Sequence, residues 1–108
     1  MTGRHTDYLD LAEAAVSRRD YLSAMQYGLR AAGAPPEETG LRCDAQMLLA
    51  IVSLELGDGE TALTYGVGAH LAACYGGDAD REQKAEAIVA MIVAQYSYLS
   101  DIHTVMLH

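Results

Sequence analysis

Histidine and cysteine are the residues of this sequence that could carry metal or nucleophilic chemistry, and their spacing matches no familiar motif. The four histidines are His5, His70, His103 and His108. The sequence has no HExxH and no CxxC, so it contains no standard zinc-binding pattern. Asp101, His103 and His108 could gather a metal near the end of the sequence, but ordinary side chains are the expectation there. We expect His70 to be a structural histidine within a helix, and we predict no metal site.

The two cysteines, Cys43 and Cys74, stand alone in stretches rich in alanine and leucine. A free cysteine in such surroundings is usually a small buried hydrophobic residue, which is what we predict for both. The sequence leaves a disulfide between them open. We expect neither to be a catalytic thiol.

Phosphate-binding loops and nucleophile turns are also missing, since no GxGxxG, GxxxxGK[ST] or GxSxG occurs. We therefore predict no enzyme activity and no cofactor.

The chain has 7 Lys and Arg against 15 Asp and Glu, a net charge of −8. This acidity argues against nucleic acid and against anionic membrane surfaces as partners. No apolar run reaches the roughly 18 residues of a membrane span, and the start of the sequence has no signal-like core, so we expect a cytoplasmic protein.

Apolar residues recur at intervals of three and four along the chain, which predicts an all-α fold of about five helices. Asp20 and Asp58 are predicted N-caps, and Asp80, followed by Gln83, is expected to open the last helix. Pro36 suits the first turn of the third helix. We predict one domain, with helical pairs at about residues 8–33 and 41–76 and a C-terminal helix at about 79–102.

An internal repeat relates the two helical pairs at an offset of 38 residues, as from Ala24 to Ala62. Small residues recur where two helices would have to cross closely. The matched positions are Asp20 and Asp58, Ala24 and Ala62, Tyr27 and Tyr65, Gly28 and Gly66, and Ala31 and Ala69.

These residues resemble the tetratricopeptide repeat, a helix-turn-helix unit of about 34 residues. Leu49-Ala50, Leu56-Gly57-Asp58, Ala62 and Ala69 are similar to the small-residue pattern of that family, and the likeness covers about residues 8–70. The first pair matches less well, because Arg19 stands where the family has glycine. The family's tryptophan and closing proline are absent, and the longer period suggests an insertion in residues 33–40. An ordinary five-helix bundle is the alternative.

In the tetratricopeptide family the first helix of each unit lines a concave groove. The resemblance places in such a groove Thr6, Leu9, Glu13, Val16 and Ser17 from the first unit, and Asp44, Met47, Ile51, Leu54 and Glu55 from the second. The groove would have an apolar floor and acidic rims, which suits an amphipathic helix with basic flanks. The alternative is that the apolar members, Leu9, Met47, Ile51 and Leu54, belong to the core. Glu13 and Glu55 could pair across the groove, but solvated charges are the expectation.

The last helix is apolar nearly all round, which predicts that a second surface covers it. Ala85, Ile88, Ile92 and Leu99 share one face. Another face carries Ala87, Met91, Ala94 and Tyr98. A second copy of the chain or a different protein would cover that face, unless the helix is the centre of a compact bundle.

The sequence therefore predicts a protein-binding module that cradles an amphipathic helix of a partner. Its size, charge and expected architecture resemble the small tetratricopeptide export chaperones of type III secretion systems. The alternative function is a self-associating scaffold that dimerises through the C-terminal helix.

Overall fold

The computed structural model describes residues 3–96, and this part of the chain forms five α-helices and no strand. The predicted all-α class is confirmed. The helices are α1 (Gly3–Ser17), α2 (Tyr21–Ala32), α3 (Thr39–Glu55), α4 (Gly59–Tyr75) and α5 (Ala79–Gln95). None of these described helices is both long and apolar enough to cross a membrane.

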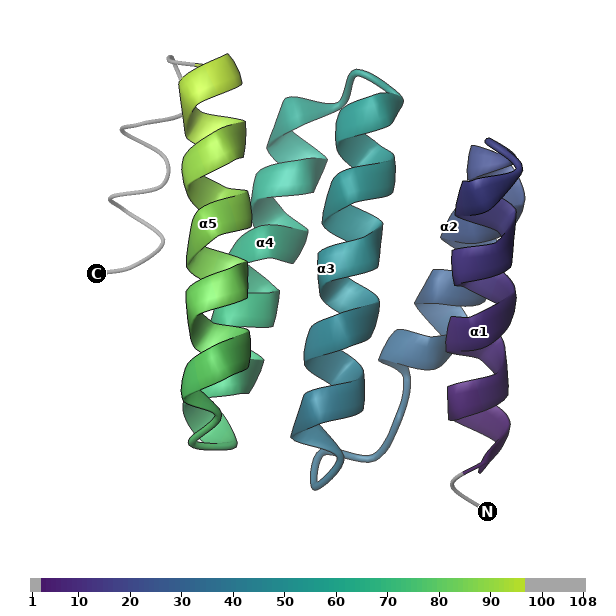
Figure 1. Ribbon diagram of the computed structural model, residues 1–108, viewed down its shortest axis with the longest axis vertical. Helices are drawn as coiled ribbons and strands as arrows, with labels where there is room; N and C mark the ends of the chain where they lie inside the picture. Colours follow the sequence, from purple (N-terminus) through teal and green to yellow (C-terminus); the bar gives the residue numbers. More distant parts are fainter. Residues whose placement is uncertain (1–2, 97–108) are drawn as a thin grey trace.

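The helices form two layers (Figure 1). Helices α1, α3 and α5 lie side by side in front, and α2 and α4 lie behind them. Each helix packs mainly on its neighbours in the sequence, and α3 also contacts both α1 and α5. The front layer thus brings together three helices that are separated along the chain.

Three of the turns between helices share one backbone conformation. The residue before each helix-capping aspartate has a positive φ, of 59° at Arg19, 79° at Gly57 and 63° at Gly77. Glycine adopts this left-handed conformation at little cost, whereas a residue with a Cβ is strained there. Arg19 is therefore the less favourable residue of the three, at the position where the first repeat departs from the second.

The helices that follow these turns are capped by aspartate side chains. Asp20 accepts a hydrogen bond from the backbone N–H of Ser23, and Asp58 accepts one from Thr61, as predicted. The prediction for the last helix was wrong, because Asp78 is its N-cap and Asp80 lies in its first turn. The sequence offers two aspartates here, and the turn conformation at Gly77 places the first of them at the cap.

Three helix ends also differ from the predicted bounds. Helix α1 begins at Gly3, before Tyr8. Helix α3 begins at Thr39, so Pro36 lies in the preceding turn and not in the first turn of the helix. Helix α5 ends at Gln95 and not near residue 102, and residues 97–108 lie outside the described part of the chain.

The repeated small residues lie at corresponding helix crossings. Ala24 and Ala62 are completely buried. A Cβ added to Gly28 of α2 would lie 2.9 Å from Leu49 Cδ2 of α3, and one added to Gly66 of α4 would lie 3.1 Å from a Val89 methyl of α5. The close approach that explains the first repeat therefore recurs in the second.

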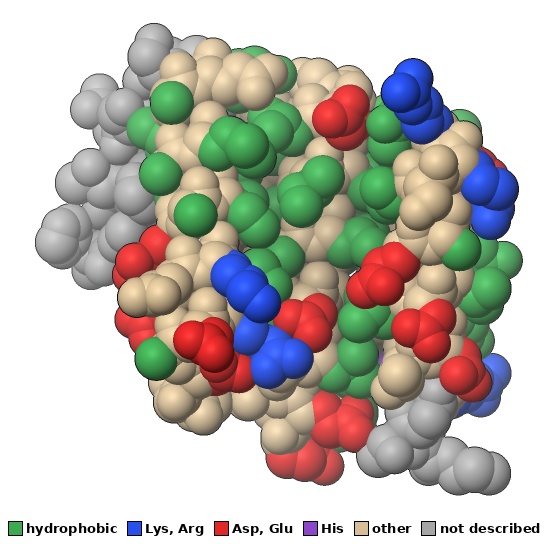
Figure 2. Space-filling view, in the orientation of Figure 1, with side chains coloured by type: hydrophobic (Ala, Val, Ile, Leu, Met, Phe, Trp, Pro, Cys, Tyr) green, Lys and Arg blue, Asp and Glu red, His purple; other side chains and the backbone are tan. Residues whose placement is uncertain are grey.

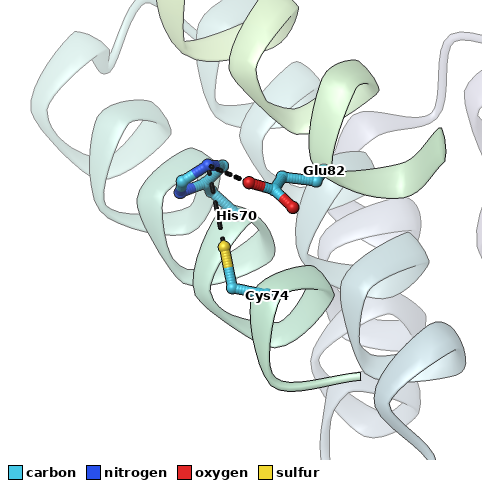
Figure 3. A group of neighbouring side chains, drawn as sticks. All are labelled: His70, Cys74 and Glu82. Carbon is cyan, nitrogen blue, oxygen red and sulfur yellow. Dashed lines mark hydrogen bonds and ion pairs between the residues drawn. The ribbon is translucent and has the colours of Figure 1, made fainter. Parts of the chain in front are cut away.

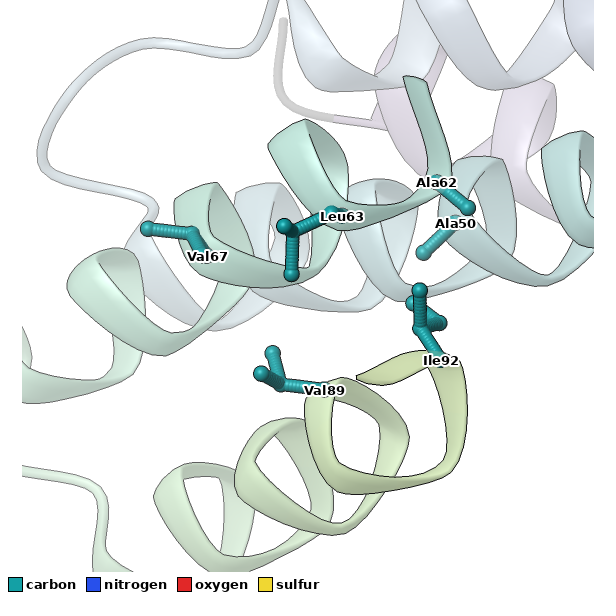
Figure 4. Packing of buried hydrophobic residues seen from close by; sticks show 6 residues of the cluster. All are labelled: Ala50, Ala62, Leu63, Val67, Val89 and Ile92. Carbon is teal, nitrogen blue, oxygen red and sulfur yellow. The ribbon is translucent and has the colours of Figure 1, made fainter. Parts of the chain in front are cut away.

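The largest buried cluster joins α3, α4 and α5 (Figure 4). Ile92 of α5 points toward Ala50 and Ala62, where two small side chains leave room for it. Leu63 and Ile92 are fully buried there. Helix α5 thus packs on α3 of its own layer and on α4 of the layer behind, and its remaining faces lie at the surface.

Candidate functional site

An open groove of about 540 Å³ runs across the front layer. Side chains of α1, α3 and α5 line it, and most of the lining is apolar. The lining residues are Glu13, Val16, Asp44, Met47, Leu48, Ile51, Lys84, Ala87 and Ile88. Figure 2 shows this face, with hydrophobic side chains along its middle, Asp and Glu beside them, and a group of Lys and Arg in the lower half.

The structure brings together many of the residues predicted to form a partner-binding surface. The predicted residues that line the groove are Glu13, Val16, Asp44, Met47, Ile51 and Ala87. Ile51 is 39% exposed, so it offers apolar surface to a ligand. Met47 also packs against the buried cluster around Cys43, so it supports the groove floor as well as lining it.

Other predicted groove residues lie elsewhere. Leu9 is buried and packs with Ala31 and Ala45, because this side of α1 faces α2 and α3. Leu54 packs against the cluster of Figure 4. Glu55 is exposed at the end of α3 and is not among the residues that line the groove. Leu9 and Leu54 therefore belong to the core, which was the alternative to a place in the groove.

The predicted second face of α5 is present at the surface. Met91 is 46% exposed, and Ala87 and Ala94 are exposed as well. The buried face of α5 is formed by Ala85, Val89 and Ile92. Ile88, predicted to be on the buried face, is only partly buried and lines the groove. Tyr98 lies outside the described residues.

Asp44 is not a free charge at the rim of the groove. Its carboxylate accepts hydrogen bonds from Arg81 Nε at 2.8 Å and from Arg81 Nη2 at 2.9 Å. Hydrogen bonds from Arg81 to Asp44 and to Asp78 raise the pKa of the guanidinium further above its usual value. Lys84 adds a positive charge to the lining. The acidic rim predicted from the sequence is therefore partly neutralised.

A second cavity, of about 550 Å³, lies between α4 and α5. Its described lining is apolar except for two polar side chains, His70 and Glu86. His70 Nε2 lies 3.1 Å from Glu86 Oε1 and 3.7 Å from Glu82 Oε1. This pair of contacts links the two helices beside the cavity.

Cys74 lies next to the same histidine, with its Sγ 3.9 Å from His70 Nε2 (Figure 3). Cys74 is exposed, so the prediction that both cysteines are buried was wrong for it and right for Cys43. The reason is that Cys74 lies in the last turn of α4, where Tyr75 and Gly76 are exposed as well and Ala73 is the residue that joins the cluster around Cys43. Neither cysteine forms a disulfide.

The two thiols are not activated for nucleophilic attack. Burial raises the pKa of Cys43 to about 11. Desolvation is the main cause that raises the pKa of Cys74, and a hydrogen bond to Glu82 is the second.

The nitrogen, sulfur and oxygen atoms around His70 are nonetheless suitable metal ligands. No standard metal-binding motif marks this group in the sequence, although the spacing of His70 and Cys74, one helical turn apart, was a visible signal.

Comparison of the chain with protein-family models, with curated proteins and with solved structures found no match. What this chain binds must therefore be inferred from its own residues.

Proposed function

We propose that this protein is a binding module whose groove holds the apolar face of an amphipathic helix from a partner protein. The observation that carries the proposal is that α1, α3 and α5 contribute to one open apolar groove, with Val16, Ile51 and Ala87 from the three helices in its lining. Amphipathic helices commonly bind such grooves through residues spaced three and four apart.

Charge supports a partner with basic residues beside its apolar face. The chain carries a net charge of −8, and among the described residues no ion pair holds Glu13 at the groove as Arg81 holds Asp44. Lys84 lies in the same lining, so an acidic side chain of the partner would have a place there as well. Such complementarity mainly sets orientation and association rate.

A role in shielding a partner's helix, as in the small tetratricopeptide export chaperones that the sequence resembles, fits a groove of this shape. The proposal includes a cytoplasmic location, which the two unpaired thiols support, since oxidising compartments favour disulfides.

Site-specific photocrosslinking tests the groove directly. A photoreactive amino acid at position 51, expressed in the source cells, should trap one defined protein. The same amino acid at Leu22, which is 72% exposed on α2, is the control and should not trap it. The crosslinked segment of the partner, made as a peptide, should bind the protein in fluorescence anisotropy.

The variant Ile51→Glu should weaken binding of that peptide by about tenfold or more, because it puts a charge against an apolar helix face. Leu22→Glu should leave the affinity unchanged. Equal crosslinking at both positions, or equal affinities of the two variants, would contradict the proposal.

Self-association through α5 is a second candidate function, favoured by the exposed Met91 with Ala87 and Ala94 on the same helix. An exposed apolar face of this kind commonly marks a protein interface. Light scattering on the purified chain distinguishes the two functions. A single dimeric species supports the scaffold, whereas a monomer that binds a partner peptide supports the groove.

A further inference from the structure

We propose that His70, Cys74, Glu82 and Glu86 form a binding site for a divalent transition metal of the zinc class between α4 and α5. This site is separate from the groove of the front layer, because α5 contributes Lys84, Ala87 and Ile88 to that groove and Glu82 and Glu86 to this cluster. The inference does not depend on the proposed helix-binding function.

Two pairs of residues build the site from two neighbouring helices. His70 and Cys74 are four residues apart on α4, and Glu82 and Glu86 are four residues apart on α5. Residues at this spacing lie on one face of a helix, about one turn apart. Helices α4 and α5 pack against each other, so the two pairs face one another across the helix contact.

The distances among the ligand atoms suit one small metal ion. His70 Nε2 lies 3.1 Å from a Glu86 oxygen, 3.7 Å from a Glu82 oxygen and 3.9 Å from Cys74 Sγ. The ligand atoms of His70, Cys74 and Glu82 all lie within 4.8 Å of one another. Tetrahedral zinc, with bonds of about 2.0–2.3 Å, separates its ligand atoms by about 3.3–3.8 Å. The ligand atoms of His70, Cys74 and Glu82 thus lie near the spacing that one ion requires, and Glu86, in contact with His70, is the fourth ligand of the proposal.

The orientation of the histidine agrees with this arrangement. Figure 3 shows the His70 ring beside both Cys74 and Glu82, with its contacts to them drawn. Nδ1 of the same ring is buried and has no hydrogen-bond partner in the described part of the chain. Nε2 is thus the ring nitrogen that faces the cluster.

The types of donor select the class of metal. One sulfur, one imidazole nitrogen and carboxylate oxygens suit zinc and cobalt, whereas magnesium and calcium prefer oxygen ligands only.

Binding forms a metal–sulfur bond and releases the thiol proton of Cys74 to solvent. The thiolate and two carboxylates carry three negative charges, so a divalent cation offsets most of the repulsion among them. Cys74 and Glu86 are exposed, which gives an ion access to the site.

Titration of the full reduced chain with Co²⁺ tests the proposal, because cobalt bound to a thiolate gives a charge-transfer band in the near ultraviolet and tetrahedral cobalt gives visible bands. We expect both signals in the wild-type protein and their loss when Zn²⁺ is added. The affinity for Zn²⁺ is then measured by competition with a chromophoric chelator.

Cys74→Ser should abolish the charge-transfer band and weaken the Zn²⁺ affinity by about tenfold or more. Glu86→Gln, at a side chain that is 60% exposed, should also weaken the affinity. The matched controls Cys43→Ala and His5→Gln should keep the band. Circular dichroism confirms that each variant is folded.

The absence of a charge-transfer band in the wild-type protein would overturn the proposal. A band that persists in Cys74→Ser, or one that is lost in His5→Gln, would overturn it as well.

Discussion

Arg81 of α5 holds the carboxylate of Asp44 of α3 through two hydrogen bonds, of 2.8 Å from Nε and 2.9 Å from Nη2. The same guanidinium donates from Nη1 to Asp78, the N-cap of its own helix, at 2.7 Å. A Cβ added to Gly40 would lie 3.1 Å from this guanidinium, so glycine leaves the room in which it binds. This contact joins the start of α5 to the helix at the centre of the front layer, and it orients Asp44 at the edge of the groove.

Asp44→Asn should lower the free energy of unfolding by about 1 kcal/mol, because it removes the charge from a two-hydrogen-bond pair whose side chains are about one-third exposed. Urea unfolding followed by circular dichroism measures the change. Asp10→Asn, which alters the net charge equally at an exposed position of α1, is the control. Equal stabilities of the two variants would show that the pair contributes nothing.

Ala24→Leu and Ala62→Leu should each destabilise the protein by about 1–3 kcal/mol, because both alanines are completely buried at close helix contacts. Ala14→Leu, at an exposed position of α1, should change the stability by less than about 0.5 kcal/mol. Thermal unfolding compares the three variants. If the two buried variants melt like the wild type, the packing of the repeat described above is wrong.

Arg19→Gly should stabilise the protein by about 0.5–1 kcal/mol, since Arg19 has a φ of 59° and glycine adopts that conformation without strain. Arg18→Gly, one residue earlier and not at positive φ, should be neutral or destabilising. The midpoint of denaturant unfolding measures both. A lower midpoint for Arg19→Gly than for the wild type would contradict a strained turn at this position.

The stability of the fold should decrease as the pH falls below the ordinary aspartate pKa of 3.8. Hydrogen bonds to the side chains of Asp20, Asp58 and Asp78 lower the pKa of each in the folded state. A lowered folded-state pKa means that the stabilisation is complete above the unfolded-state value and is lost as the folded-state groups take up protons. Unfolding curves at a series of pH values measure the effect.

Asp58→Asn provides the control for that prediction. Asparagine is an equally good N-cap but does not titrate in this range. The variant should therefore lose less stability than the wild type between neutral pH and pH 3. An identical pH dependence would show that the Asp58 carboxylate does not contribute.

Met91→Glu should keep the helical content of the wild type, because Met91 is 46% exposed and lies outside the buried clusters. If α5 forms the dimer contact, the variant should be monomeric in light scattering while Leu22→Glu, at an exposed leucine of α2, remains dimeric. Failure of Met91→Glu to fold would assign Met91 to the core. Normal association of the folded variant would exclude this face as the interface.

The sequence alone determined the five helices of the described chain and two of the three aspartates that cap them. Apolar residues at helical spacing, with Asp20 and Asp58 placed directly before two of the runs, predicted α2 and α4 closely, because such signals act within one or two turns of the chain. The repeat also predicted which alanines and glycines lie where two helices cross closely. The end of α5 was misplaced, since its apolar pattern continues beyond Gln95.

Only the tertiary structure decided what the side chains of each helix contact. Leu9 and Glu13 were predicted to share a groove, but the packing of α1 on α2 buries the first and leaves the second at the groove. The pairing of Asp44 with Arg81 and the approach of Glu82 to His70 join residues far apart in sequence. Periodicity specifies which residues share a face of a helix, but the rotation of that face toward a neighbour depends on how the helices cross, and that is set by the packing of the whole core.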